Sequence, residues 1–290
     1  MRTRRPVRRK VKYTRFRPLI LTRHPSHSPL RRKNNKDPRF LLPFRSVIRF
    51  GSTTETRRER VEINTPDAIR NSSSKLRMKR CFTEGKVRTA KWWTYGTGHF
   101  HENGIPNVSI SHKDLFYPIV AKMHYGSRGN GNVKIDNASE MEAWLKSCDN
   151  PGAFIFEVFH NFSREYRLHV TKNGCFYTCR KMIKRETPDE ERWYRNDKNS
   201  VWIMESNPDF DKPTNWSEIE EHCVRALTSV GLDVGAVDLR VQSSKQRDPD
   251  FIVIEINSAP SFGEVTLEKY KEILPDLLRQ KHAEKRQVGV

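Results

Sequence analysis

The stretch FIVIEINSAPSF (residues 251–262) constrains the fold more than any other part of the sequence. It opens with the apolar residues of a buried strand, yet it ends on Glu255 and Asn257 just before a Pro-Ser-Phe-Gly turn. Side chains two positions apart on a strand point to the same face of the sheet. A largely apolar strand that aims a carboxylate and an amide in one direction indicates a functional site.

The preceding strand LDVGAVDLRVQ (232–242) supplies a second carboxylate for this face. The two strands flank a polar loop and predict an antiparallel hairpin in which Asp238 lies opposite Glu255, with β-carbons about 5 Å apart. Like charges that face each other destabilise a sheet, so we expect a cation between them. Asp238, Glu255 and Asn257 offer oxygen ligands, which suit Mg²⁺ or Mn²⁺ held together with substrate phosphates. Solvated acids at a sheet edge, or a pairing of Glu255 with Arg240, would give the same pattern.

A second group of residues favours phosphate binding. Lys122 ends the apolar strand YPIVAK, and a glycine-rich loop, GSRGNG, follows. Small residues let a backbone approach phosphate oxygens, and the loop offers Gly126, Ser127, Gly129 and Gly131. Lys75 lies in the first turn of a predicted helix, where the macrodipole disfavours a cation unless an anion is shared with the free N–H groups. A flexible hairpin tip is the alternative interpretation of the loop.

The positive charge of the chain is concentrated at its N-terminus. Of a formal net charge of +19, residues 1–40 contribute +14, and the remaining 250 residues contribute only +5. Residues 1–36 contain four prolines and little apolar periodicity, so we expect a disordered or extended basic arm. Such an arm is either a solvated tail or a tether to a polyanion, that is, nucleic acid, an acidic protein or a particle surface. An arginine-rich transit peptide is a third interpretation.

The sequence also indicates where the protein works. No run approaches the roughly 18 apolar residues that a membrane span needs, and no secretory apolar region follows the basic start. The five cysteines are an odd number without zinc-ligand spacing, which is typical of a reducing compartment. We therefore expect a cytoplasmic protein with no membrane partner.

The order of these elements resembles the ATP-grasp superfamily: a Ser-Lys helix (SSSKLRMK), a strand YPIVAK with a glycine-rich loop, a strand FIFEVF, and a D…E-x-N pair of strands. Within it, RimK-type amino-acid ligases and phage-encoded ATP-grasp proteins are similar over about residues 63–275. The resemblance implies an α+β fold with two lobes of mainly antiparallel sheets that clasp ATP. We expect four regions: a basic tail at 1–36, a reduced N-terminal region with the lysine helix at 37–114, a small lobe at 115–161 and a large lobe at 162–290.

The resemblance implies roles for individual residues around ATP. Lys75 and Lys122 would contact the phosphates, and the loop 126–131 would close over the γ-phosphate. Three further residues would hold the nucleoside: Glu157 near the adenine amino group, Phe159 through backbone contacts to the ring, and Glu165 on the ribose hydroxyls.

The implied catalytic residues come from the large lobe. Arg167 would meet phosphate or the acceptor carboxylate, and the candidates for the γ-phosphate are Lys181, Lys184 and Arg195, with Asn196 nearby. Asp238, Glu255 and Asn257 match the ligands of two magnesium ions. An insertion at 186–213 leaves Lys181 and Lys184 interchangeable, and only residues 38–62 remain to represent the family's usual N-terminal α/β domain.

The implied activity is that of an ATP-dependent carboxylate–amine ligase. A carboxylate acceptor (an amino acid, peptide or protein) would attack the γ-phosphate of Mg·ATP to give an acyl phosphate and ADP, and an amine would then displace phosphate. A kinase on the same scaffold fits the same residues. So does a nucleic-acid-binding or particle-binding protein whose ATP site has no chemistry.

Overall fold

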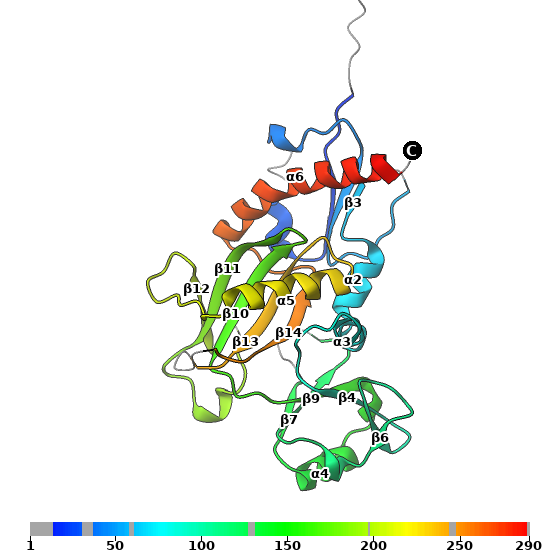
Figure 1. Ribbon diagram of the computed structural model, residues 1–290, viewed down its shortest axis with the longest axis vertical. Helices are drawn as coiled ribbons and strands as arrows, with labels where there is room; N and C mark the ends of the chain where they lie inside the picture. Colours follow the sequence, from blue (N-terminus) through cyan, green and yellow to red (C-terminus); the bar gives the residue numbers. More distant parts are fainter. Residues whose placement is uncertain are drawn as a thin grey trace, which may run out of the picture.

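The computed structural model describes residues 14–30, 37–57, 61–126, 131–196, 198–243 and 248–288. Three sheets, of three, five and six strands, follow one another along the long axis of the molecule (Figure 1). The three-stranded sheet lies at the top of Figure 1, the five-stranded sheet in the middle and the six-stranded sheet at the bottom. None of the helices in the described segments combines the length and apolar character of a membrane-spanning helix.

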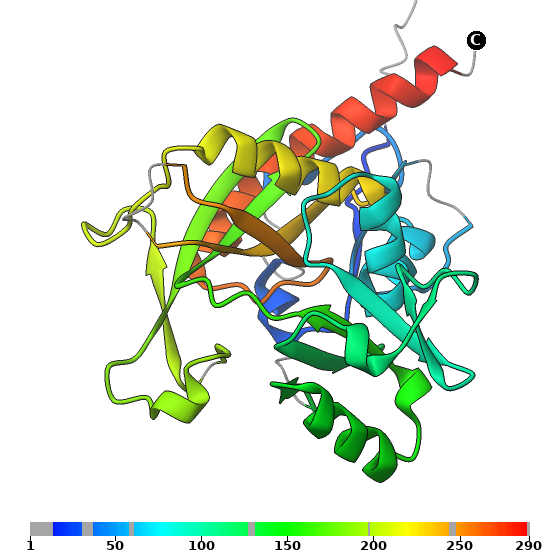
Figure 2. The same ribbon diagram turned by 60° about the horizontal axis from the view of Figure 1, so that its bottom comes forward.

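The five-stranded sheet is antiparallel and carries most of the large lobe. Its order is β12-β11-β10-β13-β14, with bounds β10 (Arg164–Thr171), β11 (Gly174–Ile183), β12 (Ser200–Met204), β13 (Val234–Val241) and β14 (Phe251–Asn257). Helices α2 (Pro66–Ser73), α3 (Lys75–Glu84) and α5 (Trp216–Ser229) share one apolar core with this sheet. The buried residues of α5 recur at helical spacing, which gives the helix one apolar face: Ile219, Cys223, Ala226 and Leu227. On the opposite face, His169 and Phe176 at one end of the sheet pack against Tyr270 of α6 (Glu264–Val288), which passes behind β10 and β11 in Figure 2. The other end of this face carries the candidate site.

The six-stranded sheet forms the small lobe. Its order is β6-β5-β4-β9-β7-β8, with bounds β4 (Trp92–Gly96), β5 (His99–Glu102), β6 (Ser109–Ile110), β7 (Ile119–Met123), β8 (Val133–Ile135) and β9 (Phe154–Val158). Helix α4 (Ala138–Ser147) begins at a capping box, because Asn137 Oδ1 accepts from the Glu140 N–H at 3.0 Å. The sheet crosses the boundary predicted at residue 114. The reason is that β4 pairs with β9, which buries the aromatic rings of Trp93 and Phe156 together.

The three-stranded sheet is parallel and is built by the N-terminal segment. It contains β1 (Leu19–Thr22), β2 (Ser46–Phe50) and β3 (Val61–Ile63), and helix α6 (Glu264–Val288) packs on it. The prediction of a disordered arm is therefore wrong for residues 14–30. The physical reason is burial: Ile20 and Leu30 lie in one core with Tyr270 and Leu274 of α6. Residues 1–13 and 31–36 lie outside the described residues, so polyanion binding by the arm stays a prediction.

His27 fastens this N-terminal segment to the loop after β14. Its Nε2 lies 2.8 Å from Pro260 O, and because a carbonyl only accepts, Nε2 carries the proton. Thr22 Oγ1 lies 2.6 Å from the other ring nitrogen, and the ring packs against Phe50 and Phe262. Segments from the two ends of the chain are thus joined beside the D…E-x-N hairpin.

The buried ring of His27 makes stability depend on pH. Burial lowers the pKa of His27 from 6.5 to about 4, against the opposing effect of the Pro260 carbonyl. Between these two values the unfolded chain binds a proton that the folded chain does not bind, so stability is complete above pH 6.5 and falls as the pH drops. We expect this group to lower the free energy of unfolding by about 2 kcal/mol between pH 7 and pH 5, measured from urea unfolding curves.

The variant His27→Gln removes the titrating ring and keeps an N–H donor for Pro260 O. Its unfolding midpoint should be lower than that of the wild type at pH 7 and should change less between pH 7 and pH 5. The exposed His99 provides the control, since His99→Gln should keep the wild-type pH dependence. An unchanged pH dependence in His27→Gln would contradict the assignment.

Candidate active site

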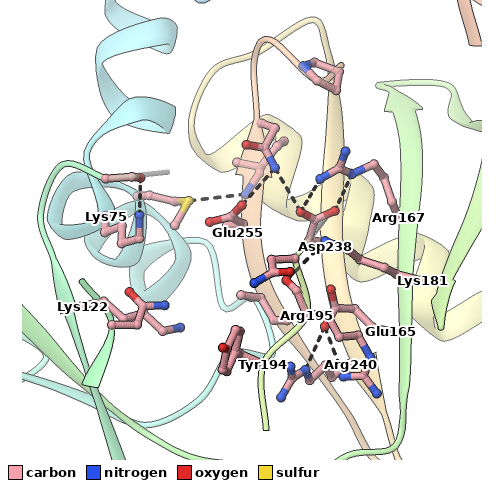
Figure 3. A pocket seen from close by; sticks show the side chains of 18 of the residues that line it. Lys75, Lys122, Glu165, Arg167, Lys181, Tyr194, Arg195, Asp238, Arg240 and Glu255 are labelled. Carbon is pink, nitrogen blue, oxygen red and sulfur yellow. Dashed lines mark hydrogen bonds and ion pairs between the residues drawn. The ribbon is translucent and has the colours of Figure 1, made fainter. Parts of the chain in front are cut away.

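A cavity of about 840 Å³ opens between the lobes, on the face of the five-stranded sheet opposite α5. Figure 3 shows Lys75 and Lys122 on one side of it and Arg167, Asp238 and Glu255 on the other. Thirteen of the residues predicted from the sequence line this cavity: Lys75, Lys122, Gly126, Glu157, Phe159, Glu165, Arg167, Lys181, Arg195, Asn196, Asp238, Glu255 and Asn257. Lys184 and Gly131 do not line it, and Ser127 and Gly129 lie outside the described residues.

The β13–β14 hairpin brings the three oxygen-bearing side chains together. Asp238 pairs with Glu255 and Ala236 with Asn257, which confirms the predicted register at this end. A bulge after Asp238 shifts the rest of the hairpin by one residue. Asn257 Nδ2 donates to Asp238 Oδ2 and to Glu255 Oε1, both at 3.1 Å. Turning this amide about its Cβ–Cγ bond would present its oxygen to the same point, so the donor set fits Mg²⁺ or Mn²⁺.

Arg167 places a positive charge beside Asp238, on the side away from Glu255. Its Nε and Nη2 donate to the two oxygens of Asp238 at 2.6 and 2.8 Å. Burial disfavours the charged guanidinium, but Asp238 outweighs that effect and raises the pKa of Arg167. Glu255 forms no ion pair within the described parts of the chain, since Arg240 pairs with Glu165 instead. The predicted alternative of a Glu255–Arg240 pair is therefore not formed.

Glu157 on β9 is held between two lysines. Lys122 Nζ on β7 lies 2.9 Å from Glu157 Oε2, and Lys79 Nζ on α3 lies 3.4 Å from Oε1. Burial disfavours the Glu157 carboxylate, but the two ammonium groups outweigh burial and lower its pKa. Burial lowers the pKa of Lys79 to about 8, although Glu157 opposes that shift. The Glu157 carboxylate therefore stays ionised, with an ammonium group in contact with each of its oxygens.

Lys75 is the first residue of α3, as predicted. Ser74 caps the helix by accepting from the Arg77 N–H at 3.4 Å. Lys75 Nζ donates to Gly126 O at 2.7 Å, so its side chain reaches the start of the glycine-rich loop. Gly131 at the far end of that loop has φ +74°, a conformation that favours glycine. The lysine therefore stands at the start of α3 and beside the loop. The N–H of Lys75 itself donates to His124 O at 2.8 Å, so the expected sharing of an anion with free N–H groups would require this bond to be exchanged.

Glu165 on β10 is paired with two arginines. Arg240 Nε lies 3.0 Å and Arg195 Nη1 3.4 Å from Glu165 Oε2. Burial acts against its charge, but Arg240 and Arg195 lower the pKa of Glu165 overall. Burial also lowers the pKa of Arg195 to about 10, with Glu165 opposing. A ribose hydroxyl would thus meet a carboxylate that already accepts from two cations.

The structure separates the two lysines that the sequence leaves interchangeable. Lys181 Nζ lies in the cavity, donates to Arg195 O at 3.2 Å and stands 5.2 Å from the Trp202 ring centre. Lys184 Nζ instead donates to Lys198 O at 2.7 Å, away from the cavity lining. Lys181 is the better placed of the two for a phosphate.

Phe159 lies where strand β9 leaves the sheet. Its N–H donates to Pro118 O at 2.8 Å, and its ring meets Trp193 edge-on at 6.2 Å. The predicted backbone contact to adenine therefore requires the Phe159 carbonyl or an exchange of the bond to Pro118.

The sequence did not predict three aromatic residues that line the cavity, the role of Arg240, or the buried lysine behind Glu157: Trp193, Tyr194, Trp202 and Lys79. Two of them had a signal. Lys79 is one helical turn after Lys75, and Arg240 is two residues after Asp238 on the same face of a strand. The aromatic residues had none, because the 186–213 insertion offers no periodicity to place them.

No family model matches the chain, and no curated protein matches it. Among solved structures, the chain is similar to D-alanine–D-alanine ligase from Bacillus anthracis, at 12% identity and a TM-score of 0.54 over 79% of this chain and 73% of that one. It is also similar to the same ligase complexed with ATP, at 11% identity and a TM-score of 0.59 over 94% and 98% of the two chains. The chain has the ATP-grasp fold, with α+β lobes and mainly antiparallel sheets.

The Arg167–Asp238 pair provides a stability prediction. Arg167→Met leaves the largely buried Asp238 carboxylate without its cation, which should lower the free energy of unfolding by about 3–5 kcal/mol. Adding Asp238→Asn removes the unpaired negative charge and should restore most of the lost free energy of unfolding. Urea unfolding of the single and double variants measures this, with the exposed Arg185→Met as control. A fully stable Arg167→Met variant would show that the pair contributes nothing.

Proposed function

We propose that this protein is an ATP-dependent carboxylate–amine ligase that works through an acyl phosphate. The observation that carries the proposal is the meeting of two groups in one cavity of an ATP-grasp fold. One group is the oxygen cluster of Asp238, Glu255 and Asn257, and the other is the lysine pair Lys75 and Lys122. Oxygen ligands and lysines converging on one space suit a nucleotide triphosphate with its divalent cation.

Charge neutralisation is the main task of such a site, because a carboxylate acceptor and the γ-phosphate repel each other. Asp238, Glu255 and Asn257 would hold Mg²⁺ or Mn²⁺, which supplies charge stabilisation for the phosphate oxygens when bound. Lys75 and Lys122 would bind the phosphates from the small-lobe side. Arg167 and Lys181, which stand over Trp202, would bind the γ-phosphate and the acceptor from the other side.

The proposed ligase reaction has two steps, phosphorylation of the acceptor and amide formation. An acceptor carboxylate oxygen bonds to the γ-phosphorus while the bond to the ADP oxygen breaks, which gives an acyl phosphate and ADP. An amine nitrogen then bonds to the acyl carbon, the carbon–oxygen bond to phosphate breaks, and the amine loses a proton, leaving an amide and phosphate. Positioning and electrostatics perform most of this work, and the acyl phosphate must be kept from water.

The nucleoside end would be held by the residues around β9 and β10. Glu157 would face the adenine amino group, and Glu165 the ribose hydroxyls. Both carboxylates are ionised and held in place by their cation partners, so each offers fixed acceptor oxygens. Phe159 and Trp193 would add apolar contacts to the ring.

A screen for ADP release tests the proposal, with Mg·ATP, a panel of amino acids and carboxylate peptides, and amine donors. Intact-mass analysis of the products and of the protein itself identifies what is made. An amide formed only when both substrates are present supports the ligase. A stable phosphorylated product without any amine requirement would instead show a kinase, and ATP binding without turnover would show a binding protein.

The metal-ligand set gives a direct test. The double variant Glu255→Gln, Asn257→Ala removes one charge and one ligand oxygen and should lower ADP release roughly 100-fold or more, with unchanged circular dichroism. Val265→Ala, at an exposed position of the segment that follows β14 and outside the cavity lining, is the control for local damage. Wild-type turnover in the double variant would show that the metal is not bound here.

Lys181 and Lys184, the two candidate lysines for the γ-phosphate, provide a test variant and its matched control. Lys181→Ala should lower ADP release by about 10- to 100-fold, because its ammonium faces the cavity. Lys184→Ala should leave the rate within about twofold, since its ammonium is bonded to Lys198 O outside the cavity lining. Equal losses in the two variants would contradict the assignment of Lys181.

A further inference from the structure

Lys79 is a buried cation that has no place in the chemistry proposed above. Its side chain is fully buried, and it is not among the residues that line the cavity. It points instead at Glu157 of β9 from one side and at Thr89 from the other, to which it donates a hydrogen bond. Burying an ammonium group is costly, so its presence here requires a compensating role.

Lys79 joins three elements that supply cavity residues. It belongs to α3, which begins with Lys75, and it contacts Glu157 on β9. Through Thr89 it also reaches β14, because Thr89 Oγ1 donates to Val253 O at 2.9 Å, two residues before Glu255. A single side chain thus links the lysine helix, the small-lobe sheet and the metal-ligand strand.

The two carboxylate oxygens of Glu157 pair with different lysines, one that faces the cavity and one that is buried away from it. Oε2 pairs with Lys122, which lines the cavity, and Oε1 pairs with Lys79, which does not. Only Lys122 can turn toward a nucleotide phosphate. Without Lys79, that turn would leave the Glu157 carboxylate, whose side chain is 6% exposed, with no cation in contact among the described residues.

We propose that Lys79 is a positioning residue that retains Glu157 and thereby frees Lys122 to bind the nucleotide. The inference deepens the proposed function and rests on its nucleotide site, although it does not depend on the identity of the acceptor or amine. One carboxylate and two ammonium groups leave one positive charge for the phosphates. With Lys79 absent, Glu157 and Lys122 neutralise each other, and nucleotide binding must break their pair.

The test is a double-variant cycle read by calorimetric binding of the non-hydrolysable analogue AMP-PNP with Mg²⁺. Lys79→Met should weaken binding by about tenfold in the wild-type background and by less than about twofold in the Glu157→Gln background, where Lys122 is already free. Lys79→Arg should retain most of the wild-type affinity. A purely structural role would weaken binding equally in both backgrounds, which would overturn the proposal.

The control is Lys271→Met, which removes a buried, ion-paired lysine of α6 outside the cavity lining and should leave affinity unchanged. Should Lys79→Met fail to fold, Lys79→Gln carries the same comparison. If the wild-type protein binds AMP-PNP but forms no amide, the ligase proposal is wrong, and the double-variant cycle still decides the role of Lys79. A wild-type protein that does not bind AMP-PNP at millimolar concentration would overturn the Lys79 proposal as well.

Discussion

The candidate site depends on the antiparallel pairing of β13 with β14. This pairing puts Asp238 directly opposite Glu255, so two carboxylates share one face at a spacing that sheet geometry fixes. The repulsion is relieved from the neighbouring strand, because the β10–β13 register puts Arg167 opposite Asp238. One set of strand registers thus creates both the clustered negative charge and the cation beside it. A one-residue slip would send these side chains to the opposite face, among the apolar side chains of the core.

The remaining charges of the cavity are arranged as ion pairs that a ligand can rearrange. Lys122 is paired with Glu157 on the neighbouring strand of the six-stranded sheet. Glu165 is paired with Arg240, its cross-strand partner, and with Arg195. Phosphate oxygens compete for the same cations, so nucleotide binding exchanges one anionic partner for another instead of desolvating bare charges. Glu255 differs, since within the described residues it lacks a cation partner. It is the carboxylate best suited to a bound metal ion.

Local patterns predicted much of this site. Alternation along a strand placed Asp238, Glu255 and Asn257 on one face, and serine followed by lysine placed Lys75 at the start of α3. These features depend on residues near one another in the sequence or in one hairpin. The bulge after Asp238, the pairing of Arg240 with Glu165 and the burial of Lys79 depend on contacts between distant segments. Periodicity carries no information about such contacts, so they could not be derived.

The N-terminal segment is a second case in which a contact between distant segments decides the structure. Three apolar residues, Leu19 to Leu21, among many arginines are too few to indicate a strand, and their composition is that of a disordered arm. The strand is held because its central residue, Ile20, is buried in one core with α6 from the other end of the chain. The consequence reaches the cavity: Gly51 has φ +70°, and a β-carbon there would lie 3.0 Å from Ala259 Cβ, two residues after Asn257. Gly51 and Ala259 both line the cavity, as do Arg23 and His24, so the N-terminal segment forms part of the cavity wall beside Asn257.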